Sequence, residues 1–275
     1  MVMSVNTNVG AMVALQNLNS TSQDLMQVQG RISTGLKVAS AKDDGAVWAM
    51  AQNQRATSMS LNAVKDSLQR SQSTVDVAIS AGQTVSDLLV QMKAKALASS
   101  DTTLDTASRS ALNADFTALR DQLAKVVSNA DFNGANMIKA SGSTIAALAN
   151  ADGTSKITVA AQSLALGGAN VTVAATGSIS TVTLAAAMIT TVATSITNVS
   201  AALAKLGTGS NSLQSHLAFV SKLQDTLDAG VSNLVDADLA KESARLQALQ
   251  TKQQLGIQAL SIANQSTSSL LGLFR

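Results

Sequence analysis

The chain has 275 residues, enough for one or two domains, and 46% of them are apolar although only 2% are aromatic. A net charge of +2, with 13% charged residues, is too weak an electrostatic signal to indicate nucleic-acid binding, and the absence of cysteine excludes disulfides and thiolate metal sites. A core must therefore come from Ala, Val, Leu, Ile and Met, which suits closely packed helices that no proline interrupts.

The first 35 residues carry a weak helical repeat. The opening MVMSVNTNVG has neither a basic region nor an apolar one, so we expect no Sec signal peptide. Apolar residues then recur at spacings typical of one helix face, at Ala11, Leu15, Leu18, Leu25, Val28 and Ile32. This pattern predicts a helical N-terminal arm with one apolar seam.

Residues 61–96 show the clearest periodicity. From Leu61 to Ala96, small or apolar residues alternate spacings of three and four, which is a heptad seam held for about five heptads. A helix of that length measures about 50 Å, too long for a compact globule. Residues 104–127 predict another helix, and the turn residues of SNADFNGAN end it.

The composition changes between residues 141 and 183. Glycine, serine and threonine, with the short runs KITV and NVTV, predict a small β-region there. The helical period then returns, with an expected break at GTGSNS and a last helix beginning near DADLAKES, whose acidic residues suit a helix N-terminus. Residues 157–204 and 253–274 carry no charge, but polar residues and glycine interrupt both stretches, so we expect no membrane span.

The closing segment QALSIANQSTSSLLGLFR has apolar residues with nothing to cover them. One helical stripe contains Leu260, Ala263, Thr267, Leu270 and Phe274. Gly272 and a run of serine and threonine make this segment a poor helix by itself. We therefore expect the two terminal arms to pair with each other, and another surface to cover what remains.

No constellation of residues indicates catalysis. The single His216 excludes any site that needs two histidines, and we interpret it as a surface or boundary residue. DAD at 236–238 has no His or Cys nearby and is interpreted as a helix N-terminus. SAKDDG at 40–45 predicts a solvated turn, and Trp48 is interpreted as a packing residue. LGTGS is interpreted as a helix break rather than a phosphate-binding loop. We predict no enzyme, no cofactor and no metal.

Two long blocks of the chain resemble the bacterial flagellin family. SVNTNVGAMVALQNLN is similar to the family's opening, and RISTGLKVASAKDDGAVWAMA at 31–51 is similar to its block R-[IL]-S-[ST]-G-L-[KR]-[IV]-x-S-A-K-D-D. DFNG at 131–134 matches a shorter motif, and residues 233–275 follow the family's closing pattern from NLVDADLAKES to LFR. The resemblance covers residues 4–139 and 184–275.

The resemblance implies a mainly α fold. It is a long antiparallel coiled-coil helical bundle, or rod, with paired terminal helices and a small β-hairpin region. Residues 1–43 and 236–275 would form the two arms of an inner terminal-helix domain. Residues 44–235 would form the rod domain, with its β-region at about 140–183. That central segment is too short for the outer domains that many flagellins carry.

The resemblance also implies the function, which is a structural subunit that polymerises into the flagellar filament, the helical propeller for swimming. A flagellar hook–filament junction protein is the alternative. The implied partners are other copies of the chain, the flagellar export apparatus with an export chaperone, and the filament cap and hook-junction proteins, without nucleic acid or membrane insertion. The implied location is extracellular, reached by flagellar type III secretion without a cleaved Sec signal.

Residues are assigned to these roles by the arm seams and by the family motifs. The expected assembly interface contains Leu15, Leu18, Leu25, Ile32, Leu246, Leu249, Ile257, Leu260, Leu270, Leu271 and Phe274. The family-motif residues are Lys42, Asp43, Asp44, Asn264, Gln265 and Arg275. In flagellins that activate the flagellin-sensing Toll-like receptor, the second rod helix contains a stretch similar to L-Q-R-x-R-E-L. Residues 89–95 here read LVQMKAK, so we expect this chain to activate that receptor weakly.

Overall fold

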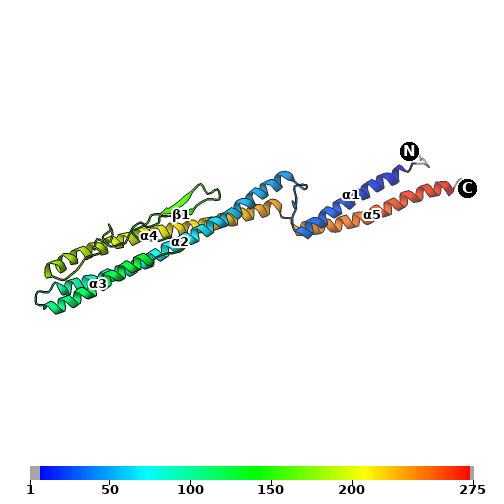
Figure 1. Cartoon of the computed structure of the whole chain (residues 1–275). Coiled ribbons are helices and arrows are strands. Elements are labelled where there is room, and N and C mark those ends of the chain that lie inside the picture. Colours follow the sequence, from blue (N-terminus) through cyan, green and yellow to red (C-terminus); the bar gives the residue numbers. More distant parts are fainter. Residues whose placement is uncertain (1–6, 273–275) are drawn as a thin grey trace. The chain divides into compact units, whose positions relative to one another are not determined.

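The computed structural model describes the backbone of residues 7–272 and the side chains of residues 7–265. Its elements, in chain order, are α1 (Val9–Thr34), α2 (Gly45–Ser99), α3 (Thr106–Asn129), β1 (Ile145–Leu148), β2 (Lys156–Val159), α4 (Val182–Val235) and α5 (Leu239–Gly272) (Figure 1). This confirms the mainly α fold with a small antiparallel hairpin. The side chains of the predicted residues Leu270, Leu271, Phe274 and Arg275 lie outside the described part.

The chain divides into two compact units. Unit 1 combines Met1–Ala56 with Thr226–Arg275, and unit 2 is Thr57–Asp225. In unit 1, α1 and α5 lie side by side (Figure 1). They are antiparallel, because residue 8 contacts residue 263 at one end and residue 31 contacts residue 242 at the other.

In unit 2, α2 and α4 run antiparallel. Gln224 donates to the side chain of Asn62 at 2.9 Å, and Ser210 donates to the side chain of Asp76 at 3.3 Å. Residue numbers therefore decrease along α4 in the direction in which they increase along α2. All eleven positions of the predicted seam in 61–96 are buried, which confirms the heptad pattern. Phe116 and Leu123 of α3 complete this core and are fully buried.

The β-region is smaller than the sequence predicts. β1 and β2 pair antiparallel, with Ile145 opposite Val159, so KITV is a strand as expected. NVTV, at 170–173, forms no strand and has only a single bridge between Leu166 and Val171. The backbone N–H of Thr172 donates instead to the Ser195 hydroxyl of α4 at 3.0 Å, so this N–H bonds to a helix side chain rather than to a strand.

The predicted helix break at GTGSNS is wrong, because α4 continues through it without interruption. Glycine in a helix costs only about 1 kcal/mol relative to alanine, and no proline accompanies it. Leu206 and Leu213, on either side of the glycines, are both buried and hold the helix in place. Gly209 also has a packing role, since a Cβ built there lies 2.6 Å from Cγ1 of Val159 in β2.

One helix in the described part of the chain, α4, is long and apolar enough to cross a membrane by length and composition alone. Its Val192, Val199 and Leu206 are fully buried within unit 2. These three side chains therefore pack against protein in this structure.

Candidate assembly surface

Helix α1 has well-defined ends. The Asn8 side chain accepts a hydrogen bond from the Ala11 N–H at 3.0 Å and caps the first turn. At the other end, Gly35 adopts a left-handed φ of 73° and its N–H donates to the Arg31 carbonyl at 2.8 Å. Only glycine takes this conformation without strain, so the family block RISTG contains the stop signal of the arm.

The face of α1 that meets α5 is a strict heptad seam. Buried or half-buried residues alternate spacings of three and four, at Ala11, Ala14, Leu18, Thr21, Leu25, Val28 and Ile32. The matching positions on α5 are Glu242, Leu246, Leu249, Gln253, Gly256, Leu260 and Ala263. Leu25, Val28 and Leu249 form the buried centre of this seam, with Ile32 and Leu246 packed against it. The predicted pairing of the two arms is therefore present within one molecule.

The structure separates the predicted interface residues into two groups. Leu18, Leu25, Ile32, Leu246, Leu249 and Leu260 all lie in the α1–α5 seam. Leu15 and Ile257 lie outside it and are 48% and 54% exposed. The seam contains the preceding residues, Ala14 and Gly256, instead. Because a step of one residue turns a side chain by about 100° around the helix, Leu15 and Ile257 point away from the centre of the seam.

Small and polar residues in the seam are the positions that sequence reasoning partly missed. Gln253 and Gly256 are recognisable from the α5 spacing, whereas Ala14 and Thr21 do not stand out by hydrophobicity. Gly256 lets the arms approach closely, because a Cβ built there lies 3.3 Å from Cδ1 of Leu18. Extending the three-and-four alternation backward from Leu18 would have identified Ala14.

The outer faces of both arms expose apolar side chains. Those more than 45% exposed are Val9, Met12, Val13, Leu15 and Met26 on α1, and Leu239, Leu255, Ile257 and Ile262 on α5. A shallow groove on α1 is lined by Met12, Leu15, Gln16, Asn19, Ser20 and Gln23. A second groove on α5 is lined by Ile257, Leu260, Ser261, Asn264 and Gln265, which includes two of the family-motif residues. Neither groove has a charged lining residue.

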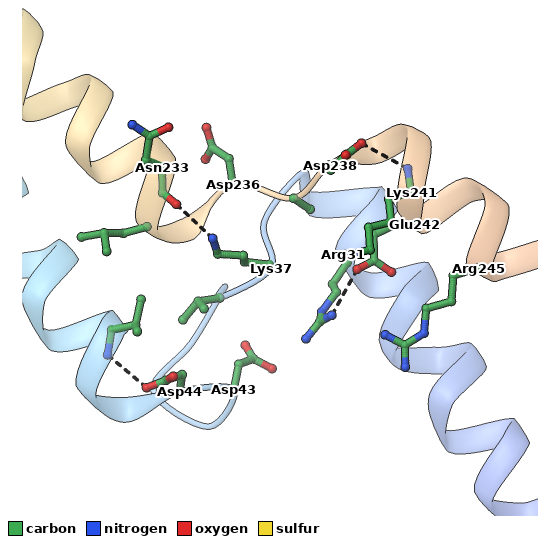
Figure 2. Close-up of a pocket in the computed structure, with 14 residues that line it drawn as sticks. Arg31, Lys37, Asp43, Asp44, Asn233, Asp236, Asp238, Lys241, Glu242 and Arg245 are labelled. Atoms are coloured by element: carbon green, nitrogen blue, oxygen red, sulfur yellow. Dashed lines mark hydrogen bonds and ion pairs between the residues drawn. The ribbon is translucent and has the colours of Figure 1, made fainter.

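At the base of the arms, polar groups join the segments that lead into and out of α1 and α5. Arg31 donates to Oε1 of Glu242 at 3.1 Å, and Figure 2 shows the two side chains pointing toward one another between α1 and α5. Lys37 Nζ donates to the carbonyl of Asn233 at 2.9 Å. The first contact connects α1 to the start of α5, and the second connects the linker after α1 to the end of α4.

The acidic motif residues act as caps for turns and helices. Asp43 accepts hydrogen bonds from the N–H groups of Ala39 and Ser40, and the Ser40 hydrogen bonds hold the pKa of its carboxyl below the ordinary value of 3.8. Asp44 caps the first turn of α2 by accepting from Ala46 and Val47.

Three further residues that the sequence analysis interprets, Asp238, Lys42 and Trp48, lie as those interpretations expect. Asp238 caps α5 by accepting from the N–H groups of Ala240 and Lys241, so DAD is a helix N-terminus. Lys42 is exposed in its turn. Trp48 packs against a buried cluster that includes Val38 and Val235.

The described residues contain no group of three or more His, Cys, Asp or Glu side chains placed to hold a metal ion. His216 lies on α4, where its Nε2 is 2.7 Å from the carbonyl oxygen of Ala149 and its ring is 5.6 Å from that of Phe219. It therefore joins the hairpin to the helix, as expected for a boundary histidine.

Comparison with known proteins agrees with the sequence motifs. The N-terminal helical region of bacterial flagellins matches residues 5–143, and their C-terminal helical region matches residues 189–274. The chain is 61% identical to flagellin FljM of Caulobacter vibrioides over 272 residues, which cover 99% of this chain and 98% of that protein. It is 34% identical to a flagellin of Brucella melitensis over 281 residues, which cover 99% of each. A crystal structure of Bacillus cereus flagellin is similar in fold, with a TM-score of 0.50 and 20% identity over 56% of this chain and 88% of that one.

Proposed function

Because the chain belongs to the bacterial flagellin family and is a structural subunit of the flagellar filament, we propose that its copies join through the outer faces of α1 and α5. The observation that supports this most directly is the exposed apolar surface of both arms, on the side that the α1–α5 seam leaves uncovered. Exposed apolar side chains that gather on one surface often mark a protein–protein interaction site. A second copy supplies that partner in a homopolymer.

The two groups of predicted interface residues then have different roles in this proposal. Leu18, Leu25 and Leu249 hold the two arms together within one subunit. Leu15 and Ile257 face outward and contact neighbouring copies, and the amides of Asn264 and Gln265 supply hydrogen bonds around them. Leu270, Leu271 and Phe274 belong to the same proposed assembly interface, with Leu271 two heptads after Ile257 and with Leu270 and Phe274 on the sequence stripe of Leu260.

We propose a division into domains at the two turns beside the arm bases. Residues 1–43 and 236–275 form the inner terminal-helix domain, and residues 44–235 form the rod domain. The caps of Asp44 on α2 and Asp238 on α5 support these boundaries, because each fixes the first turn of a helix directly after a linker.

The export route and the further partners are also proposals. The subunit leaves the cell through the flagellar type III apparatus without a cleaved Sec signal, accompanied by an export chaperone. It then contacts hook-junction proteins at the base of the filament and the cap at its tip. It binds no nucleic acid, inserts into no membrane and catalyses no reaction. Its filament location is extracellular, as for the flagellin family.

Paired substitutions on the outer faces test the proposed assembly surface. The double variant Leu15→Gln, Ile257→Gln places polar groups where copies would meet, while the double variant Leu15→Met, Ile257→Leu keeps both positions apolar. We expect the first to elongate wild-type filament seeds at least about tenfold more slowly, since burying each polar amide without a partner costs about 1–3 kcal/mol. The conservative pair should elongate them at a near-normal rate.

Sedimentation and electron microscopy of seeded reactions measure this difference. Circular dichroism of each monomer checks that the helices are retained. Normal elongation by the glutamine variant would show that the subunits join through other faces.

A further inference from the structure

Two methionines occupy equivalent positions on the outer face of α1. Met12 and Met26 are each 62% exposed, whereas Met92 and Met137 in unit 2 are fully buried. Each of the exposed pair directly follows a seam residue, Ala11 or Leu25, so both point to the same side of the helix, away from the seam. They are two heptads apart, a separation of about 21 Å along the helix axis.

The groove around Met12 is lined by apolar side chains and by uncharged polar ones. Met12 shares its groove with Leu15, Gln16 and Gln23, among others. A thioether is flexible and apolar and fits such a surface well. The chain has no cysteine, so exposed methionine is the principal side chain on this surface that a peroxide oxidises.

We propose that Met12 and Met26 form a reversible oxidation site that controls whether the subunit can assemble. A peroxide transfers one oxygen atom to each thioether sulfur: the O–O bond breaks, an S=O bond forms, the sulfur is oxidised by two electrons and the peroxide leaves as water or an alcohol. Methionine sulfoxide reductases reverse the change: the S=O bond breaks, two thiols supply two electrons and two protons and form a disulfide, and the oxygen leaves as water. This regulation rests on the proposed assembly through the outer face of α1.

The effect on assembly follows from the position of the sulfur atoms. In the free subunit a sulfoxide remains hydrated, and the α1–α5 seam on the opposite side is unaffected. In the filament the same sulfoxide would have to leave water at a contact shaped for an apolar side chain. Oxidation therefore prevents addition of a subunit without unfolding it, and a subunit already in the filament has these two sulfur atoms protected.

Limited treatment of the monomer with hydrogen peroxide, followed by peptide mass spectrometry and seeded elongation, tests the proposal. Three chains are compared: wild type, Met12→Leu with Met26→Leu, and Met50→Leu with Met59→Leu. Met50 and Met59 lie on α2 and are also well exposed, so the third chain is a control for general oxidation. Each elongation rate is divided by that of the same chain before treatment.

We expect Met12 and Met26 to be oxidised before Met92 and Met137. Wild type and the α2 control should then lose at least about tenfold in relative elongation rate, if each buried sulfoxide acts as an unsatisfied polar group. The Met12→Leu, Met26→Leu chain should stay within about twofold of its untreated rate. Reduction of the oxidised wild type by methionine sulfoxide reductases should restore its elongation.

Three results would overturn the proposal. Wild type oxidised at both sites elongates normally, the Met12→Leu, Met26→Leu chain loses as much of its rate as wild type, or the reductases remove both sulfoxides without restoring elongation. If the Leu15→Gln, Ile257→Gln variant elongates seeds normally, the proposed assembly through the outer faces is wrong, and the regulation falls with it.

Discussion

At the scale of single residues, two glycines of α4 that are two positions apart have opposite surroundings. A Cβ built at Gly209 lies 2.6 Å from Cγ1 and 3.0 Å from Cγ2 of Val159, a stiff side chain that is 4% exposed. A Cβ at Gly207 meets nothing within 4 Å. The two positions are therefore a matched pair in one helix.

We expect Gly207→Ala to raise the free energy of unfolding by about 1 kcal/mol through helix propensity. Gly209→Ala should lower it by about 1–2 kcal/mol, because overpacking against Val159 outweighs the same gain in propensity. Urea unfolding of the two variants measures both effects. A shift in the same direction for both would show that the hairpin moves aside without cost.

The acid sensitivity of the α3 cap is a second prediction at this scale. Hydrogen bonds from Ser108 hold the pKa of Asp105 below its ordinary value of 3.8. A carboxyl with a lowered folded pKa stabilises the fold at pH values above 3.8 and loses that contribution as the pH falls below 3.8 and through the folded pKa. Asp43 and Asp101 have pKa values lowered in the same way and contribute in the same window.

Asp105→Asn separates the cap from its charge, because asparagine caps a helix about as well as aspartate. Between about pH 5 and about pH 3, we expect its urea midpoint to fall less than that of the wild type. Thermal melts across the same range would check this independently. An equal fall in both chains would exclude a contribution from Asp105.

At the scale of the helices, periodicity is what the sequence predicts most reliably. Every seam position of residues 61–96 is buried, because a long uninterrupted heptad leaves only one face for a partner. In the shorter arms, Leu15 and Ile257 stand out by hydrophobicity although the seam contains Ala14 and Gly256. A pattern of apolar residues cannot distinguish a helix face that meets the same molecule from one that meets a neighbour.

The predictions that fail have a common physical cause, which is tertiary contact. GTGSNS continues as helix because the flanking Leu206 and Leu213 are buried. NVTV, at 170–173, packs against α4 rather than forming a strand, and its Thr172 N–H donates to Ser195 of that helix. Ser195 is 23 residues away from Thr172, and Val159, which lies against Gly209, is also distant in the sequence, so local propensity contains no information about either contact.

The arm pair is predicted to open more readily than the core of unit 2. Its buried apolar centre consists of Leu25, Val28 and Leu249, with Gln253 and Gly256 farther along the seam. In the free subunit we therefore expect the amides of residues 9–34 and 239–265 to exchange faster than those of residues 61–96. Equal protection of both regions would show that the arms are rigid before assembly.

A substitution in the seam tests whether weak packing is the cause. Gln253→Leu adds an apolar side chain to the seam, and we expect it to slow exchange in the arms by about tenfold, corresponding to about 1.4 kcal/mol of added burial. Gln250→Leu makes the same change at an exposed position of α5 and should leave exchange in the arms nearly unchanged. Mass spectrometry after deuterium labelling measures both variants.

At the scale of the whole molecule, the arm surfaces and the core of unit 2 should be separable by truncation. Deleting residues 266–275 removes Leu270, Leu271, Leu273 and Phe274, whose burial would contribute about 6–12 kcal/mol before entropy is subtracted. The core of unit 2 is made by residues of Thr57–Asp225, none of which is deleted.

We expect the truncated monomer to keep the melting transition of unit 2 and to fail to elongate wild-type seeds. Differential scanning calorimetry and seeded sedimentation assays measure the two properties on the same preparation. A truncated subunit that elongates seeds at the normal rate would show that the terminal stripe is dispensable for assembly.

The contact between Arg31 and Glu242 spans 211 residues of the chain and determines when unit 1 can close during protein synthesis. At about 5–20 residues per second, Glu242 leaves the ribosome about 10–40 s after Arg31. Unit 2 is continuous in sequence and is complete before α5 has been made. During translation, α1 therefore has no α5 to pair with. The apolar seam of the N-terminal arm stays uncovered until synthesis of α5 is complete.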